Sequence, residues 1–111
     1  RTLILDARPV LSVGEASIPE VFALHQNYPN PFNPTTTINY DIPESQIVSI
    51  MIYDVMGREV RTLINEFQEL GYKAIRWDAT DNLGRSVSAG MYIYTIQAGD
   101  FRQVRKMVLL K

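Results

Sequence analysis

The chain has 111 residues, of which 46% are hydrophobic and 21% are charged, and its formal net charge at pH 7 is −1. That length suits one domain, and the balanced charge leaves no basic surface for nucleic acid or for an anionic membrane. The absence of cysteine excludes disulfides, thiolate metal sites and thiol nucleophiles, and no apolar run approaches the roughly 18 residues of a membrane-spanning helix.

The first residues of the chain are the least regular. The chain begins at Arg1 without a methionine and without a signal peptide, so we expect it to be a piece of a longer protein. Gly14–Glu20 has the composition of a linker. We therefore interpret residues 1–18 as a linker or as the tail of an upstream domain, and we expect the C-terminal domain over residues 19–111.

A run of three prolines follows, in the segment NYPNPFNP at Asn27–Pro34. Tyr28, Asn30 and Asn33 each precede a proline, which favours extended backbone, and each proline fixes its own φ near −65°. Prolines also lack the N–H that a central strand must donate. The sequence therefore predicts a stiff, strand-like lead along the edge of a sheet, with Phe32 turned inward.

The middle of the chain alternates between apolar and polar residues. Thr37–Ile42 and Ile47–Tyr53 each place every second side chain on one apolar face, which is typical of a strand. Asp54–Arg58 has the composition of a turn, and Glu59–Ile64 resumes the alternation, so a hairpin is expected. Residues 65–70 are polar and too few for an independent helix, and we expect a loop there.

The last third of the chain contains further strand patterns. Tyr72–Trp77 is expected to turn Trp77 into the centre of the core, and Asp78–Arg85 is a polar connector. Met91–Ile96 and Phe101–Leu110 are expected to form a hairpin through the short turn between them.

These elements together define a fold class. Their count and the absence of helical periodicity predict an all-β fold, an immunoglobulin-like antiparallel β-sandwich of about seven strands. A small barrel is the alternative.

Few residues offer chemistry. The single histidine, His25, precedes the proline run and is expected to have a surface or capping role, so no nucleophilic triad is predicted. Asp78 and Asp81 are the best pair of carboxylates, but their spacing departs from the calcium-loop pattern, and turn-forming side chains are the simpler interpretation. An aromatic set could provide either a sugar-binding platform or core packing, and we favour the core; its members are Tyr28, Tyr53, Tyr72, Tyr92, Tyr94 and Trp77. No enzymatic activity, cofactor or metal is expected.

Four stretches of the chain resemble one protein family. They are FALHQNYPNPFNPTTTINYDIP (Phe22–Pro43), IYDVMGREVRTL (Ile52–Leu63), GYKAIRWDATDNLGRSVSAGMYIYTI (Gly71–Ile96) and KMVLLK (Lys106–Lys111). In this order they closely resemble the C-terminal sorting domains of type IX secretion cargo, over about residues 20–111. Ala79 departs from the pattern, because the family often has glycine after the Trp-Asp pair.

The resemblance implies a sorting signal rather than an enzyme. Such domains are carried at the end of proteins that cross the outer membrane of Gram-negative bacteria, and many are removed by a cell-surface sortase that joins the cargo to lipopolysaccharide. The implied partners are outer-membrane secretion and sortase components and the upstream cargo domain of the same polypeptide, and the implied location is the cell surface or the extracellular space. The residues expected to form the recognised region are Asn27, Pro29, Asn30, Pro31, Phe32, Asn33, Pro34, Gly90, Arg105, Lys106 and Lys111.

Two other functions fit the same strand pattern. One is an immunoglobulin-like accessory module that binds carbohydrate or another surface, and the other is a structural domain of the flagellar hook-capping kind. Met107–Leu110 also has a purely structural interpretation, as the last core strand, which is compatible with recognition of the terminus.

Overall fold

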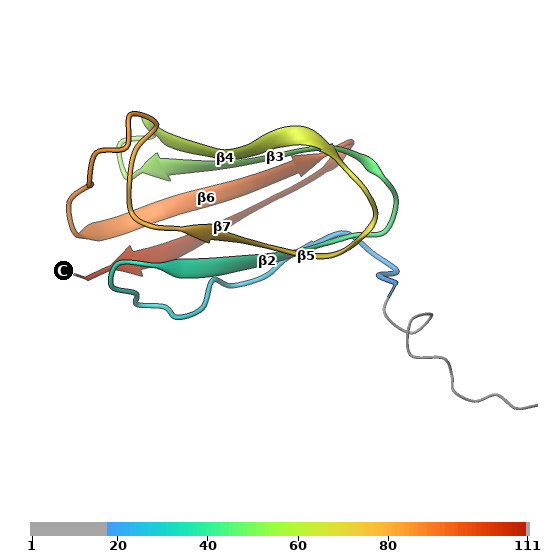
Figure 1. Cartoon of the computed structure of the whole chain (residues 1–111), viewed down its shortest axis with the longest axis horizontal. Helices are drawn as coiled ribbons and strands as arrows, with labels where there is room; N and C mark the ends of the chain where they lie inside the picture. Colours follow the sequence, from blue (N-terminus) through green and yellow to red (C-terminus); the bar gives the residue numbers. More distant parts are fainter. Residues whose placement is uncertain (1–17, 111) are drawn as a thin grey trace, which may run out of the picture.

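The computed structural model describes residues 18–110, which form two antiparallel sheets packed face to face (Figure 1). A three-stranded sheet has the order β1-β2-β5, and a four-stranded sheet has the order β4-β3-β6-β7. The predicted all-β, immunoglobulin-like sandwich is confirmed. The strands are β1 (Ala23–Leu24), β2 (Thr36–Ile42), β3 (Gln46–Asp54), β4 (Glu59–Gln68), β5 (Gly71–Trp77), β6 (Gly90–Ala98) and β7 (Phe101–Leu109).

Alternation along β2 and β3 supplies much of the core. Successive side chains of a strand point to opposite faces, so every second residue is directed at the facing sheet. The buried residues are the predicted ones, with 0–1% exposure. They are Ile38, Tyr40 and Ile42 from β2, and Val48, Ile50 and Ile52 from β3.

The loop expected at residues 65–70 is wrong, because β4 continues to Gln68. Its register with β3 extends from the turn to the pair Gln46↔Gln68 and is interrupted by two irregularities. Asn65 to Phe67 are exposed, so the pattern of an inward apolar face is absent there. Backbone pairing with β3 holds this edge strand extended where side-chain periodicity gives no signal.

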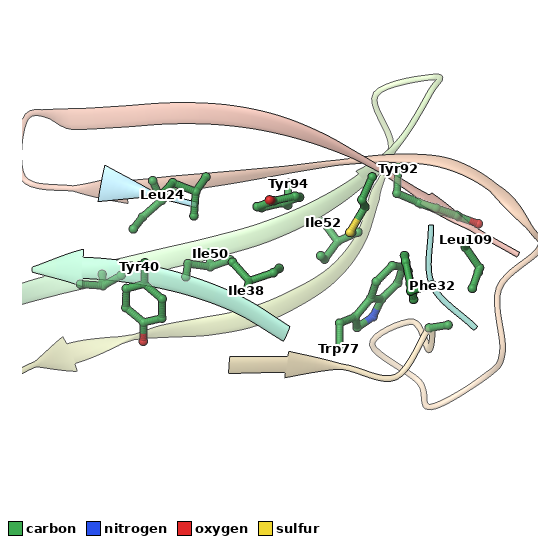
Figure 2. Packing of buried hydrophobic residues seen from close by; sticks show 14 of the residues in the cluster. Leu24, Phe32, Ile38, Tyr40, Ile50, Ile52, Trp77, Tyr92, Tyr94 and Leu109 are labelled. Carbon is green, nitrogen blue, oxygen red and sulfur yellow. The ribbon is translucent and has the colours of Figure 1, made fainter. Parts of the chain in front are cut away.

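Trp77 is fully buried in the core, as predicted, and lies towards the end of the sandwich that holds Phe32 (Figure 2). Its ring packs edge-on against the Tyr92 ring, with the ring centroids 5.4 Å apart, and in a tilted arrangement against the Phe32 ring, with the centroids 5.8 Å apart. The indole Nε1 donates to the Thr80 carbonyl at 2.8 Å, so the polar end of the ring is satisfied. Ala79, which lies between Trp77 and Thr80 in the chain, has a φ of +64°, a left-handed conformation that glycine adopts more easily.

The proline segment, defined as Asn27–Pro34, is not the continuous strand-like lead that was expected. It bends repeatedly and makes isolated bridges only at Tyr28, with Thr37, and at Phe32, with Leu109. The peptide bonds before its three prolines are cis. The predicted inward position of Phe32 is confirmed, since its side chain is 1% exposed.

The hairpins are where the sequence pattern placed them. β3 and β4 are joined through the turn at residues 55–58, and β6 and β7 are joined at residues 99–100. β7 is consequently the last strand of its sheet, with one edge paired to β6 and the other facing the N-terminal part of the domain. Among residues 18–110, no helix is long and apolar enough to cross a membrane.

Candidate functional site

The proline segment is bonded to the end of β7. The Phe32 N–H donates to the Val108 carbonyl at 3.0 Å, and the Leu110 N–H donates to the Phe32 carbonyl at 2.8 Å. The Asn30 Oδ1 accepts the Val108 N–H at 3.0 Å. These bonds occupy the free edge of a terminal strand, which would otherwise expose unpaired backbone groups. Two regions predicted separately from the sequence therefore form one structure.

Gly90 belongs to the same place. It is the first residue of β6 and is paired with Leu109, so Leu109 has Gly90 on one side and Phe32 on the other. Leu109 and Met107 are buried in the core, whereas Lys106 and Leu110 are exposed. The end of β7 is thus both a core strand and an accessible surface. Lys111 lies outside the described residues.

Asn27 fixes the start of the proline segment from inside the protein. Its side chain is 2% exposed, and its Nδ2 donates to the Pro29 carbonyl and to the Thr36 Oγ1 at 3.1 and 2.9 Å. Its backbone N–H donates to the Tyr94 hydroxyl at 2.8 Å, and that hydroxyl donates to the His25 carbonyl at 2.7 Å. Burial raises the pKa of Tyr94, which keeps this donor protonated.

Two long side chains connect β7 to the residues that precede the proline segment in the chain. The Arg105 Nε donates to the Leu24 carbonyl at 2.5 Å, and the Gln26 Nε2 donates to the Lys106 carbonyl at 2.7 Å. The structure thus gives Arg105 a bracing contact to β1. Pro29, Pro31, Asn33 and Pro34 are exposed on the proline segment.

Two turns of identical construction lie at the same end of the sandwich (Figure 1). The first is Asp54–Arg58 (DVMGR) and the second is Asp81–Arg85 (DNLGR), so both read Asp-x-x-Gly-Arg. In each, one oxygen of the aspartate accepts the N–H groups two and four residues later, and the other accepts the arginine Nε. Each glycine has φ just above +80°, which favours glycine at this position.

The paired turns were missed as a unit by the sequence reasoning, although the repeated Asp-x-x-Gly-Arg spacing was a visible signal. The second turn is held against the start of β4, because the Asn82 N–H donates to the Val60 carbonyl and the Asn82 Oδ1 accepts the Thr62 N–H. Each turn raises an apolar side chain at its tip, and Met56 and Leu83 are 75% and 74% exposed. Two exposed apolar side chains therefore lie at this end of the sandwich.

The geometry at Asp78 and Asp81 supports turn formation. The Asp81 carboxylate is occupied by the Leu83 and Arg85 N–H groups and by the Arg85 guanidinium. Asp78 accepts the Thr80 hydroxyl. Within residues 18–110 no group of three or more His, Cys, Asp or Glu side chains has the arrangement of a metal site.

The turn aspartates predict an acid-dependent stability. The backbone N–H of Arg85 is the main cause that holds the pKa of Asp81 below its ordinary value of 3.8, and the Arg58 N–H does the same for Asp54. A lowered folded-state pKa contributes stability that is present above 3.8 and lost as the pH falls through the folded pKa. We therefore expect Asp81→Asn to lower the melting temperature at pH 7, and the gap from the wild type to close below pH 3.8.

Thermal unfolding of both proteins at a series of pH values between neutral and strongly acidic checks this. A difference in melting temperature that stays constant across the series would contradict the link between the lowered pKa of Asp81 and stability.

The two sheets, together with the hydrogen bonds between the proline segment and the end of β7, define an immunoglobulin-like sandwich domain whose last strand is held by an N-terminal segment. A family model described as "Secretion system C-terminal sorting domain" matches residues 26–110. The chain belongs to this family, the C-terminal sorting domains of type IX secretion. No curated protein matches the chain in sequence.

Three solved structures are similar in fold. Dimeric latent PorU from Porphyromonas gingivalis has a TM-score of 0.64 at 23% identity, over 83% of this chain and 9% of that one. PorZ, an essential surface component of the type IX secretion system of the same organism, has a TM-score of 0.54 at 20% identity, over 81% and 11%. FlgD from P. aeruginosa has a TM-score of 0.53 at 22% identity, over 71% and 67%. The chain thus spans about a tenth of PorU and of PorZ.

Proposed function

We propose that this domain is a non-catalytic sorting signal that directs an attached cargo protein across the outer membrane by type IX secretion and to the cell surface. The family match supports the sorting role. Partners of the proposed signal are the outer-membrane secretion and sortase components, together with the upstream cargo domain of the same polypeptide.

The recognised surface is the end of the sandwich where the proline segment, Gly90 and the end of β7 meet, which we call the terminal end. The observation that supports this choice is the pair of backbone bonds between Phe32 and β7, to Val108 and from Leu110. They hold the end of β7 in a fixed conformation, so a partner can bind this surface without the entropic cost of ordering it.

Exposed apolar residues surround the terminal end and give a partner something to bury. Met56 and Leu83 project from the paired turns, and Leu110 follows β7 with 51% of its surface exposed. Apolar contact residues at the centre of an interface supply much of its binding energy. The proposed surface therefore includes these three side chains in addition to the exposed residues predicted from the sequence, and the buried Asn27 and Phe32 support it from inside.

Deleting the last six residues is a poor test of recognition. That truncation removes Met107 and Leu109, which are both buried in the core, so a loss of export would follow from unfolding alone. Surface substitutions separate recognition from folding, because exposed positions tolerate change within about 0.5 kcal/mol.

The test is an export assay with the whole chain fused to a periplasmic reporter in a strain that has type IX secretion. We expect the triple variant Met56→Ser, Leu83→Ser and Leu110→Ser to lower the exported fraction about tenfold or more, as the loss of about 1.4 kcal/mol of binding would produce. The melting temperature of the purified variant is expected to stay close to that of the wild type.

A matched control is available at the opposite end of the sandwich. Ile47 and Phe67 are 63% and 61% exposed and are paired across β3 and β4. The double variant Ile47→Ser and Phe67→Ser is expected to be exported normally. Normal export of the triple variant, or an equal loss in both variants, would contradict recognition through the terminal end.

A further inference from the structure

The outer face of the three-stranded sheet carries a second cluster of side chains, well away from the terminal end. Asn39 and Asp41 point outward from β2, and Tyr72 and Ala74 point outward from β5. The register pairs Asn39 with Ala74 and Asp41 with Tyr72. These rows lie near the end of β2 that is opposite to Phe32 and Trp77.

The cluster surrounds a shallow, open depression of about 510 Å³ on the surface of the sheet. Ala74 keeps it open, because a small side chain stands opposite Asn39 where a larger one would fill the space. The residues that line the depression are His25, Asn39, Asp41, Tyr72, Lys73 and Ala74.

One wall of the depression is an aromatic ring. Tyr72 is 57% exposed, although burial of such a ring in the core would be favourable. A hexopyranose with equatorial hydroxyls presents an apolar C–H face to a flat ring of this kind, so the exposed ring suits a sugar.

The opposite wall offers hydrogen-bonding groups that the protein does not fully use. His25 Nε2 and Asp41 Oδ2 are 2.9 Å apart, which fixes both side chains beside the ring. Within residues 18–110, the Asn39 amide and the second Asp41 oxygen have no side-chain hydrogen bond, and the Asn39 amide offers both a donor and an acceptor. Donors and acceptors are both present, as a ring of sugar hydroxyls requires.

From these features we propose that the outer face of β2 and β5 holds a binding site for a neutral, gluco-configured sugar unit. The Tyr72 ring stacks on the sugar's C–H face, and the Asn39 amide and the Asp41 carboxylate bond its hydroxyls. The carboxylate of Asp41 disfavours phosphate and other anions, because like charges repel at short range. This site is separate from the terminal end and does not depend on the sorting role.

The experiment is a titration of the isotope-labelled chain with methyl β-D-glucopyranoside, followed by NMR. We expect saturable shifts at the Asn39 side-chain amide and at Tyr72, with a dissociation constant on the order of 1 mM, as suits a small open site. Tyr72→Ala is expected to weaken binding about tenfold or more at an unchanged melting temperature. Ala74→Leu, which fills the depression and removes no polar group, is expected to do the same.

Phe67→Ala is the matched control, since it removes an aromatic ring of similar exposure from the other sheet. It is expected to leave the dissociation constant unchanged. Absence of saturation, equal losses in Tyr72→Ala and Phe67→Ala, or shifts at Tyr72 that depend on protein concentration without sugar would overturn the proposal. The last outcome would instead identify a contact between two copies of the chain.

Discussion

Replacing Phe32 by alanine is expected to lower the free energy of unfolding by about 3–5 kcal/mol, the usual cost of removing a fully buried aromatic side chain. Phe32 is 1% exposed and its ring centroid lies 5.8 Å from that of Trp77. The substitution leaves a cavity beside Trp77 that the rigid proline segment cannot fill. Urea unfolding followed by fluorescence measures the effect directly, because Trp77 is the only tryptophan in the chain.

A second readout ties this loss to the terminal strand. The Leu110 N–H donates to the Phe32 carbonyl, so loosening of Phe32 is expected to speed hydrogen exchange at Leu110. Tyr28→Ala is the control, since Tyr28 belongs to the same segment but is 77% exposed, and it is expected to change stability by no more than about 0.5 kcal/mol. A Phe32→Ala variant that loses less than about 1 kcal/mol would show that the ring does not anchor the segment.

The parts of the fold that the sequence predicted are those governed by local rules. The alternation of apolar and polar residues identified the inward faces of β2 and β3, and the composition of Asp54–Arg58 identified the turn between β3 and β4. The inward position of Phe32 was also predicted, within a segment whose three prolines lack the N–H that a central strand must donate. Each of these inferences needed only neighbours along the chain.

The parts that were missed depend on partners far away in the sequence. Residues 65–68 are strand because β3 pairs with them, and their own side chains give no period. The contact of Arg105 with the Leu24 carbonyl spans 81 positions and has no local signature. At the candidate site, the sequence supplied the proline segment and the end of β7 as separate regions. Only the three-dimensional structure brings them together through Phe32 and Leu110.

Asn27→Asp is expected to destabilise the domain by about 3–5 kcal/mol at pH 7, the cost of leaving an uncompensated charge in a buried site. Its amide nitrogen donates to the Pro29 carbonyl and the Thr36 Oγ1, and a carboxylate has no proton for either bond. The side chain is 2% exposed, so water cannot replace the lost donors. The Pro29 carbonyl oxygen would then face a negative charge without a hydrogen between them.

The same substitution carries a signature in pH that separates loss of charge balance from loss of packing. Burial raises the pKa of the introduced carboxyl in the folded state above its unfolded value of about 3.9. A raised carboxyl pKa makes the destabilisation complete above the folded pKa and makes it shrink as the pH falls towards the unfolded value. The deficit relative to the wild type, measured by urea unfolding, is therefore expected to diminish between pH 7 and about pH 4.

Two comparisons make this result specific to the buried amide. Asn30→Asp is expected to be nearly neutral, because Asn30 is exposed and its Oδ1 accepts the Val108 N–H, which a carboxylate oxygen also accepts. Asn27→Ala removes the same donors without adding a charge, so its deficit is expected to stay constant with pH. If Asn27→Asp behaved like Asn27→Ala at every pH, the introduced carboxyl would not act as an uncompensated buried charge, and the expected dependence on pH would be wrong.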